Sequence, residues 1–144
     1  MTDLEYMQYA IRQAEQGATP FGAVLLREGK IVAEAYNTVG QSHDPSAHGE
    51  INALRQAGRA LETTDLSGCV LYTTGEPCPM CMAAVLYARV DRVVYGASIP
   101  QIAEFMPQIL LRSQEIIDRS GKTLALTGGV ATDDCITLLQ QYAS

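Results

Sequence analysis

The stretch CVLYTTGEPCPMCMAAVLYARVDRVVYGA, residues 69–97, decides the fold that this sequence predicts. Residues 69–74 form an apolar run of strand length, and residues 92–97 form a second one. Pro77 between them suits the start of a helix, which we expect over about 77–88. Strands joined through a helix run parallel, because a crossover of this kind returns the chain to the edge of the sheet where it began.

The chain after this unit should add one more strand. We expect a helical stretch within 101–119, interrupted by Pro107, then a strand over 122–127. The gap between the two strands is long enough for a second crossover, so the last strand should run parallel to its predecessor. A C-terminal helix should begin at Thr132.

The chain before this unit should supply a helix and a hairpin. Residues 3–17 carry apolar side chains at three- and four-residue steps, which is typical of an amphipathic helix, and Gly17 ends it. Residues 21–27 and 31–36 are apolar strands, and the Glu-Gly-Lys break at 28–30 predicts a hairpin turn between them.

A further helix is expected over about 45–60, with Asp44 as its cap and Pro45 at its first position. Together these elements predict an α/β fold with three layers, in which a mixed five-stranded sheet carries helices on both faces. A chain of 144 residues fits one domain, so we assign residues 1–144 to a single domain.

The composition indicates an ordinary globular chain. Hydrophobic residues make up 47% and charged residues 18%, so a packed core is expected. The ten Lys and Arg residues are scattered singly, and the formal net charge is −6. Because affinity for nucleic acid depends on clustered cations, this charge argues against a polyanion as partner, without excluding one, and favours a small neutral ligand.

The sequence also bears on location. No apolar run approaches the ~18–20 residues that a membrane span needs. The first residues, Met-Thr-Asp-Leu-Glu, contain neither the positive nor the apolar region of a secretory signal. We therefore expect no membrane association, a cytoplasmic location and reduced cysteines, with Cys69 and Cys135 as buried packing residues.

Cys78 and Cys81 are candidate metal ligands. Residues three apart share one helix face, and a helix N-terminus favours thiolates. His48 is the natural third ligand, because neighbouring strand-helix units place their helix starts side by side. Three protein ligands leave one position open for water, which is typical of a catalytic zinc site. Glu50 need not join the metal and can reach the bound water instead.

Two other interpretations of these residues stay open. A C-x-x-C pair that opens a helix is also the setting of a thioredoxin-like redox pair. His43 and His48 could complete a closed structural zinc site with the two cysteines, but Glu50 would then have no role. The joint pattern of H-x-E and P-C-x-x-C is the signature of zinc deaminases, in which the Glu is the general acid/base and not a ligand.

With these motifs the chain resembles the cytidine deaminase-like superfamily, in the branch of guanine deaminases, tRNA adenosine deaminases and fungal cytosine deaminases. The resemblance implies one Zn²⁺ per chain, hydrolysis of the C–N bond of a cyclic amidine, and a homodimer. It makes Glu50 the general acid/base, and it places Asn37 and Phe21 near the base. Without the resemblance Asn37 would be interpreted as a turn residue, and Phe21 fits a core position equally well. The stretches that carry it are PFGAV (20–24), Asn37, HDPSAHGEINALRQA (43–57), LYTTGEPCPMCMAAVLYARV (71–90) and VVYGA (93–97).

The resemblance leaves the substrate open. The PFGAV and EPCPMC segments are most similar to guanine deaminases, which convert guanine to xanthine. Those enzymes carry a C-terminal tail that helps to close the active site, whereas this chain ends nine residues past Cys135. A cytosine-type or aminotriazine substrate, adenosine in tRNA, and a non-enzymatic structural-zinc or redox module remain as alternatives. Residues 98–119 are expected to shape access to the site.

Overall fold

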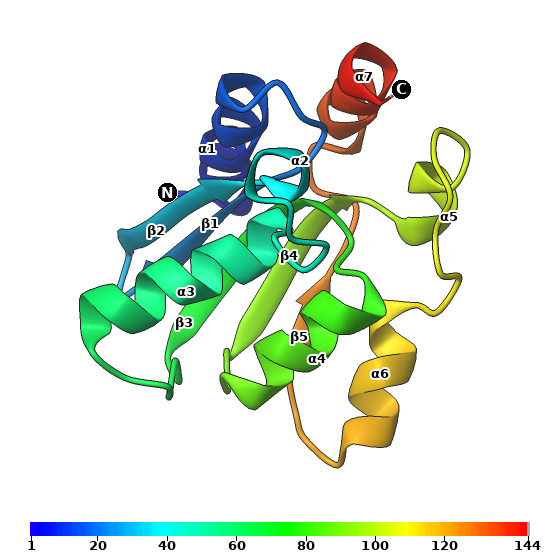
Figure 1. Cartoon of the computed structure of the whole chain (residues 1–144). Coiled ribbons are helices and arrows are strands. Elements are labelled where there is room, and N and C mark those ends of the chain that lie inside the picture. Colours follow the sequence, from blue (N-terminus) through cyan, green and yellow to red (C-terminus); the bar gives the residue numbers. More distant parts are fainter. Residues whose placement is uncertain (144) are drawn as a thin grey trace.

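The computed structural model describes residues 1–143 and contains a mixed five-stranded sheet (Figure 1). The strand order is β2-β1-β3-β4-β5. Strands β2 and β3 both pair antiparallel with β1, whereas β3, β4 and β5 run parallel. Both the hairpin and the parallel last strand are thereby confirmed. The bounds are β1 Gly22–Arg27, β2 Lys30–Tyr36, β3 Cys69–Gly75, β4 Arg92–Ala97 and β5 Ala125–Thr127.

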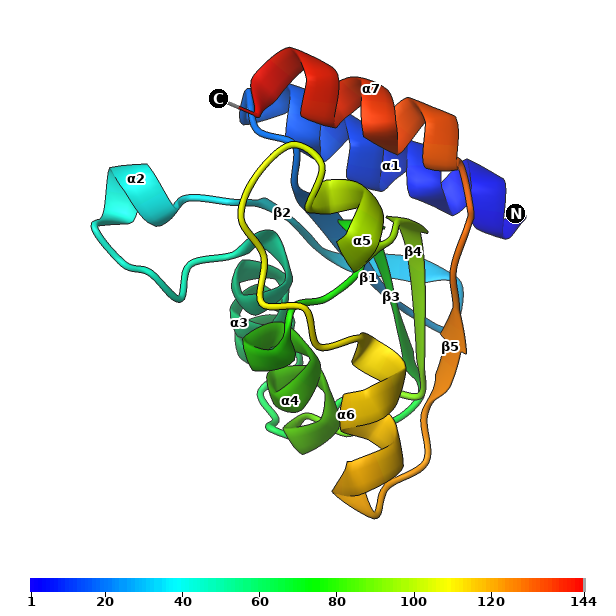
Figure 2. The ribbon, with the colours of Figure 1, turned by 90° about the vertical axis from the view of Figure 1, so that its right-hand side faces the viewer.

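Helices cover both faces of this sheet, as the sequence predicts (Figures 1 and 2). One face carries α1 (Asp3–Gln16) and α7 (Thr132–Tyr142), and the other carries α3 (Gly49–Leu61), α4 (Pro79–Tyr87) and α6 (Ser113–Ser120). Two one-turn helices, α2 (Val39–Ser42) and α5 (Ile99–Ile102), lie in connections. None of the helices in the described part of the chain combines the length and the apolar character that a membrane crossing requires.

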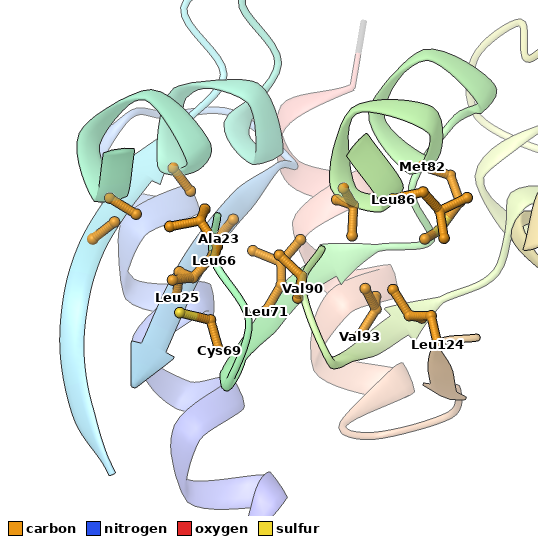
Figure 3. Packing of buried hydrophobic residues seen from close by; sticks show 14 of the residues in the cluster. Ala23, Leu25, Leu66, Cys69, Leu71, Met82, Leu86, Val90, Val93 and Leu124 are labelled. Carbon is orange, nitrogen blue, oxygen red and sulfur yellow. The ribbon is translucent and has the colours of Figure 1, made fainter. Parts of the chain in front are cut away.

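The core has two parts, one on each face of the sheet. Leu25, Leu71 and Val93 point to the face of α3, α4 and α6 (Figure 3). Their neighbours Val24 and Val94 pack on the other face, beneath α1 and α7. The central strands are therefore almost continuously apolar, because both of their faces are buried. Cys69 and Cys135 are buried packing residues, as expected.

The expected helix over 45–60 starts later than the sequence indicated. The carboxylate of Asp44 accepts hydrogen bonds from the N–H and the hydroxyl of Ser46, at 2.9 and 2.7 Å, and so forms a turn. The chain stays extended at His48, which is the N-cap, and α3 begins at Gly49. The prediction of Asp44 as helix cap is wrong because this side chain binds the backbone in a competing local structure.

The last strand is also shorter than predicted, since β5 covers only Ala125–Thr127. Gly121 adopts a left-handed conformation with φ 72° at the end of α6. The chain comes into register with β4 only at Ala125, which lies opposite Arg92.

Four strand ends meet at one edge of the sheet. Gly22 at the start of β1 lies opposite Tyr36 at the end of β2, and Gly75 at the end of β3 lies opposite Ala97 at the end of β4. The Gly22 N–H donates to Thr74 Oγ1 at 3.1 Å, which joins the two pairs. The residues that follow or precede these ends are thereby gathered at this edge.

Candidate active site

The connection from β2 to α3 brings Asn37 and His48 to this edge. The side-chain amide of Asn52, in α3, donates to the Tyr36 carbonyl at 2.9 Å and to the Ala47 carbonyl at 3.3 Å. It also donates to Thr38 Oγ1 at 2.9 Å. One amide thus ties both ends of the connection to the helix.

The connection from β3 to α4 brings the two cysteines to the same place. Cys78 is the N-cap of α4 and Pro79 is its first residue. The Cys81 N–H donates to the Cys78 sulfur at 3.5 Å, so this thiolate also satisfies a free N–H at the start of the helix.

The structure brings the three predicted metal ligands together. The ligating atoms of His48, Cys78 and Cys81 all lie within 4.8 Å of one another. His48 Nδ1 is 3.6 Å from the Cys78 sulfur and 3.5 Å from the Cys81 sulfur. Usual Zn–N and Zn–S bond lengths in a tetrahedral site place nitrogen and sulfur about 3.6 Å apart. The donors, two sulfurs and one imidazole, and their spacing therefore fit Zn²⁺.

The three groups differ in how readily they give up a proton. A hydrogen bond from Cys81 is the main cause that lowers the pKa of Cys78 to about 4, and contact with His48 adds to it. The pKa of Cys81 is raised because its thiol donates this bond and is buried. The bond with Cys78 raises the pKa of His48. The lowered pKa makes Cys78 an anionic ligand without further change, whereas a metal at Cys81 and His48 must compete with their protons.

Glu50 lies in the first turn of α3, beside the cluster and apart from its ligand set. Its residue is only 7% exposed. Burial raises the pKa of Glu50 to about 7, and the neighbouring Cys78 thiolate adds to the rise. A carboxyl group with this pKa can both take up and release a proton near neutral pH.

A pocket of about 210 Å³ opens onto these groups. Its volume lies below the usual range for drug-sized ligands, so it suits a single heterocycle. The lining includes Asn37 and Phe21, the two predicted substrate contacts, and contains neither Lys nor Arg. The residues that line it are Phe21, Asn37, His48, Glu50, Gly75, Glu76, Cys78, Ile102, Met106, Pro107 and Gln108.

The pocket also bears on the other sequence predictions. Four of its residues come from 98–119, the segment that was expected to shape access.

His43 is exposed at the C-cap of α2 and is not a member of the metal cluster found within the described residues. Its position disfavours a closed zinc site made of two histidines and two cysteines. Asn37 combines both of its possible roles, because its Oδ1 accepts the Val39 N–H at 2.9 Å while the residue lines the pocket.

Two residues at this edge were missed by sequence reasoning. Asn52 could have been suspected, because asparagine is a poor helix former and stands inside a helix. Glu76 could have been suspected as a carboxylate that directly follows an apolar strand. In the structure it is buried and is bound by residues far along the chain.

Comparison with known proteins finds deaminases among the relatives of this chain. A family model described as the cytidine and deoxycytidylate deaminase zinc-binding region matches residues 1–97. The guanine deaminase of Bacillus subtilis is 47% identical over 85 residues, which are 59% of this chain and 54% of that protein. A tRNA-specific adenosine deaminase of Aquifex aeolicus is 41% identical over 96 residues, 64% of each chain. The matches thus span between half and two thirds of these relatives.

A solved structure agrees over more of the chain. The guanine deaminase from Nitrosomonas europaea superimposes with a TM-score of 0.86 at 26% identity, covering 97% of this chain and 84% of that one. The predicted mixed sheet and three-layer architecture are therefore those of a known group of deaminases.

Replacement of Asn52 by Asp should loosen the connection that carries His48. The change removes the amide donors and points carboxylate oxygens at the carbonyls of Tyr36 and Ala47. We expect a loss of about 1–3 kcal/mol in the free energy of unfolding, because buried polar groups lose their partners. Urea unfolding of the zinc-free protein measures this change in the free energy of unfolding. A zinc competition assay should show that the variant binds zinc more weakly than the parent.

Gln56→Glu is the matched control, because it makes the same chemical change in the same helix. The side-chain oxygen of Gln56 accepts a hydrogen bond from the Glu34 N–H at 3.1 Å. Glutamate at this position keeps an oxygen that can accept the same bond. Equal destabilisation by the two variants would contradict the role given to Asn52.

Proposed function

The chain belongs to the cytidine and deoxycytidylate deaminase family, since that family's model covers residues 1–97, and we propose that it hydrolyses the C–N bond of an aminated heterocycle. The substrate class is a nucleobase or a close relative, and the amino group leaves as ammonia. The observation that carries this proposal is the buried carboxyl group of Glu50 beside three zinc-type ligands in one small pocket.

His48, Cys78 and Cys81 would hold the metal, with Glu50 outside the ligand set. When bound by three protein ligands, zinc supplies a water whose pKa is lowered to about 7, ready to attack at neutral pH. The cluster found within the described residues has no fourth ligand, so a bound metal would keep one position for water, unlike a closed structural site.

Glu50 moves the protons. It takes a proton from the attacking water and passes it to the ring nitrogen beside the carbon that bears the amino group. It then takes the second proton of the former water from the hydroxyl now bonded to that carbon and delivers it to the amino group. The bond between carbon and the amino nitrogen breaks, ammonia departs and the carbon becomes a carbonyl. A pKa of about 7 matches this double task, because proton transfer in both directions is then balanced near neutral pH.

Asn37 and Phe21 orient the base. The Asn37 Oδ1 is held by the Val39 N–H, so the Nδ2 group is the part available as a donor to a ring oxygen or nitrogen. A Cβ added at Gly75 would lie 3.2 Å from the Phe21 ring, so this ring closely borders the pocket floor. The apolar ring suits the flat face of a base.

Guanine is the substrate that we favour, with xanthine as the product. The guanine deaminases of Bacillus subtilis and Nitrosomonas europaea resemble this chain in sequence and in fold, respectively. The pocket lining lacks Lys and Arg, and the chain carries a net charge of −6, which suits a neutral free base.

Adenosine in tRNA is the second candidate, because the relative from Aquifex aeolicus is a tRNA-specific adenosine deaminase. The net negative charge disfavours tRNA as partner. The glycine between His48 and Glu50 does not discriminate between these substrates. A Cβ at Gly49 would lie 3.4 Å or more from its neighbours, so alanine would fit there and the glycine leaves the pocket unchanged.

We also assign residues 1–144 to one catalytic domain that forms a homodimer. The support is a hollow between α4 and α6 where Tyr87 is 81% exposed beside the partly exposed Ala83 and Ile116, with Arg119 and Lys122 also in its lining. An exposed aromatic side chain with arginine nearby is typical of contacts between proteins.

Glu50→Gln should abolish turnover while zinc stays bound. Loss of the general acid/base typically lowers kcat by about 10²–10⁴-fold. Ammonia release and zinc content, measured on the same preparation, test this expectation. Glu15→Gln makes the same change at an exposed carboxylate on α1, away from the pocket, and should leave kcat unchanged. A Glu50→Gln variant with near-normal kcat would refute the mechanism.

Ammonia release from a panel of compounds identifies the substrate. Zinc-loaded protein is offered guanine, adenine, cytosine, aminotriazines, their nucleosides where these exist, and a tRNA anticodon arm. We expect the highest kcat/KM for guanine. Release from the tRNA arm alone would overturn the free-base assignment, and release from no compound would overturn the proposed deamination.

Tyr87→Lys should convert the dimer to a monomer, because it replaces the exposed aromatic ring of the contact by a charge. Sedimentation velocity over a range of protein concentrations measures the change. Leu4→Lys serves as control, since Leu4 is 54% exposed on α1, on the other face of the sheet. A wild-type chain that sediments as a monomer would rule out the dimer.

A further inference from the structure

The carboxylate of Glu76 is buried, with 1% of its side chain exposed, and accepts hydrogen bonds from three residues. Its Oε1 accepts the Ile99 N–H at 2.8 Å, and its Oε2 accepts the Ser113 N–H at 2.8 Å. Arg112 Nε donates to both oxygens, at 2.9 and 3.1 Å. This carboxylate is therefore saturated with donors from the chain itself.

Two of these donors are the first residues of helices. Ile99 begins α5 and Ser113 begins α6. Backbone N–H groups at a helix start have no partner within the helix, and they form its positive end. One carboxylate thus caps two helices at once. The Ser113 hydroxyl also donates to the Pro77 carbonyl at 2.7 Å, next to Cys78.

These bonds close the chain between the two helix starts into a loop. We call residues 99–112 the pocket segment, which appears in Figure 2 as α5 and the loop that leads from it to α6. Ile102, Met106, Pro107 and Gln108 of this segment line the pocket together with Glu50. Both ends of the pocket segment are therefore fastened to the residue two positions before Cys78.

Packing contributes little to holding the later part of the pocket segment. Ile109, Leu110 and Leu111 are 68%, 70% and 43% exposed. A buried carboxylate paired with a guanidinium adds little net stability, because its desolvation offsets the attraction. The hydrogen bonds to Glu76 therefore mainly fix the position of the pocket segment and add little to the free energy of unfolding.

We propose that Glu76 is a positioning residue that holds the pocket segment at a fixed distance from the metal ligands and from Glu50. It sets the width of the pocket and hence the fit of the substrate, without contact with the reacting atoms. The kinetic part of its test rests on the proposed deaminase function, whereas the structural part does not.

Glu76→Gln tests the proposal. Glutamine keeps one acceptor oxygen, but its NH₂ group must face the N–H of either Ile99 or Ser113, so one end of the pocket segment is released. We expect hydrogen–deuterium exchange of residues 103–111 to become faster while zinc content stays unchanged. With the substrate found in the ammonia screen, KM should rise by about 10–100-fold and kcat should change less, because misplacement by about 1 Å has effects of this size.

Asp3→Asn is the matched control for a general loss of stability. It weakens another carboxylate–arginine pair, between Asp3 and Arg92 at 2.7 Å. This pair lies away from the pocket, so KM and the exchange of residues 103–111 should stay as in the parent. An equal rise of KM in both variants, or unchanged exchange and KM in Glu76→Gln, would overturn the proposal.

If Glu76→Gln does not fold, Arg112→Gln tests whether the bonds to Glu76 hold the pocket segment in place. The Arg112 side chain is 43% exposed, so its replacement is tolerated more easily. The change removes the hydrogen bonds from Arg112 Nε to Glu76 but leaves those from the Ile99 and Ser113 N–H groups. Exchange of residues 103–111 should therefore rise to a level between those of the parent and of Glu76→Gln. Exchange identical to that of the parent would overturn the proposal. If the parent releases no ammonia from any compound, the proposed function fails, and the exchange measurements alone decide the role of Glu76.

Discussion

The pairing of β3 with antiparallel β1 on one side and parallel β4 on the other is the constraint on which the site depends. It brings the start of β1 and the ends of β3 and β4 to one edge of the sheet. Open α/β sheets bind ligands beyond the carboxyl ends of parallel strands, where connections diverge. Each chemical group of the site lies on a connection that leaves or enters this edge, so a different register would disperse all of them.

The sequence was sufficient for features that depend on local pattern. The hairpin, the β3-α4-β4 unit and the parallel β5 follow from apolar runs and turn residues, and the ligand spacing around Cys78 and Cys81 predicts a metal site. The start of α3 was mispredicted because Asp44 has two competing local structures of similar quality, a helix cap and a turn with Ser46. Glu76 was missed because its partners lie 23 to 37 residues further along the chain, where no local pattern reveals them.

The chemistry of the cluster separates the alternatives for Cys78 and Cys81. A redox pair needs the two sulfurs alone, and a closed zinc site needs a fourth protein ligand. Here His48 lies within reach of both sulfurs as a third possible ligand, and beside the three lies the buried Glu50, whose pKa burial raises to about 7. Burial of such a carboxyl costs stability because it opposes the charged form, and carboxyls of this kind are typical of functional sites.

The hydrogen bonds of Glu76 have a consequence for the order of assembly during synthesis. Chains emerge from the ribosome N-terminus first. His48, Cys78 and Cys81 precede the partners of Glu76 at Ile99 and Ser113. The donors of the metal cluster are therefore all made before the residues that fasten the wall of the pocket. Until Arg112 and Ser113 have been made, the Glu76 carboxylate lacks two of the three residues that donate to it, and the later end of the pocket segment cannot be fastened.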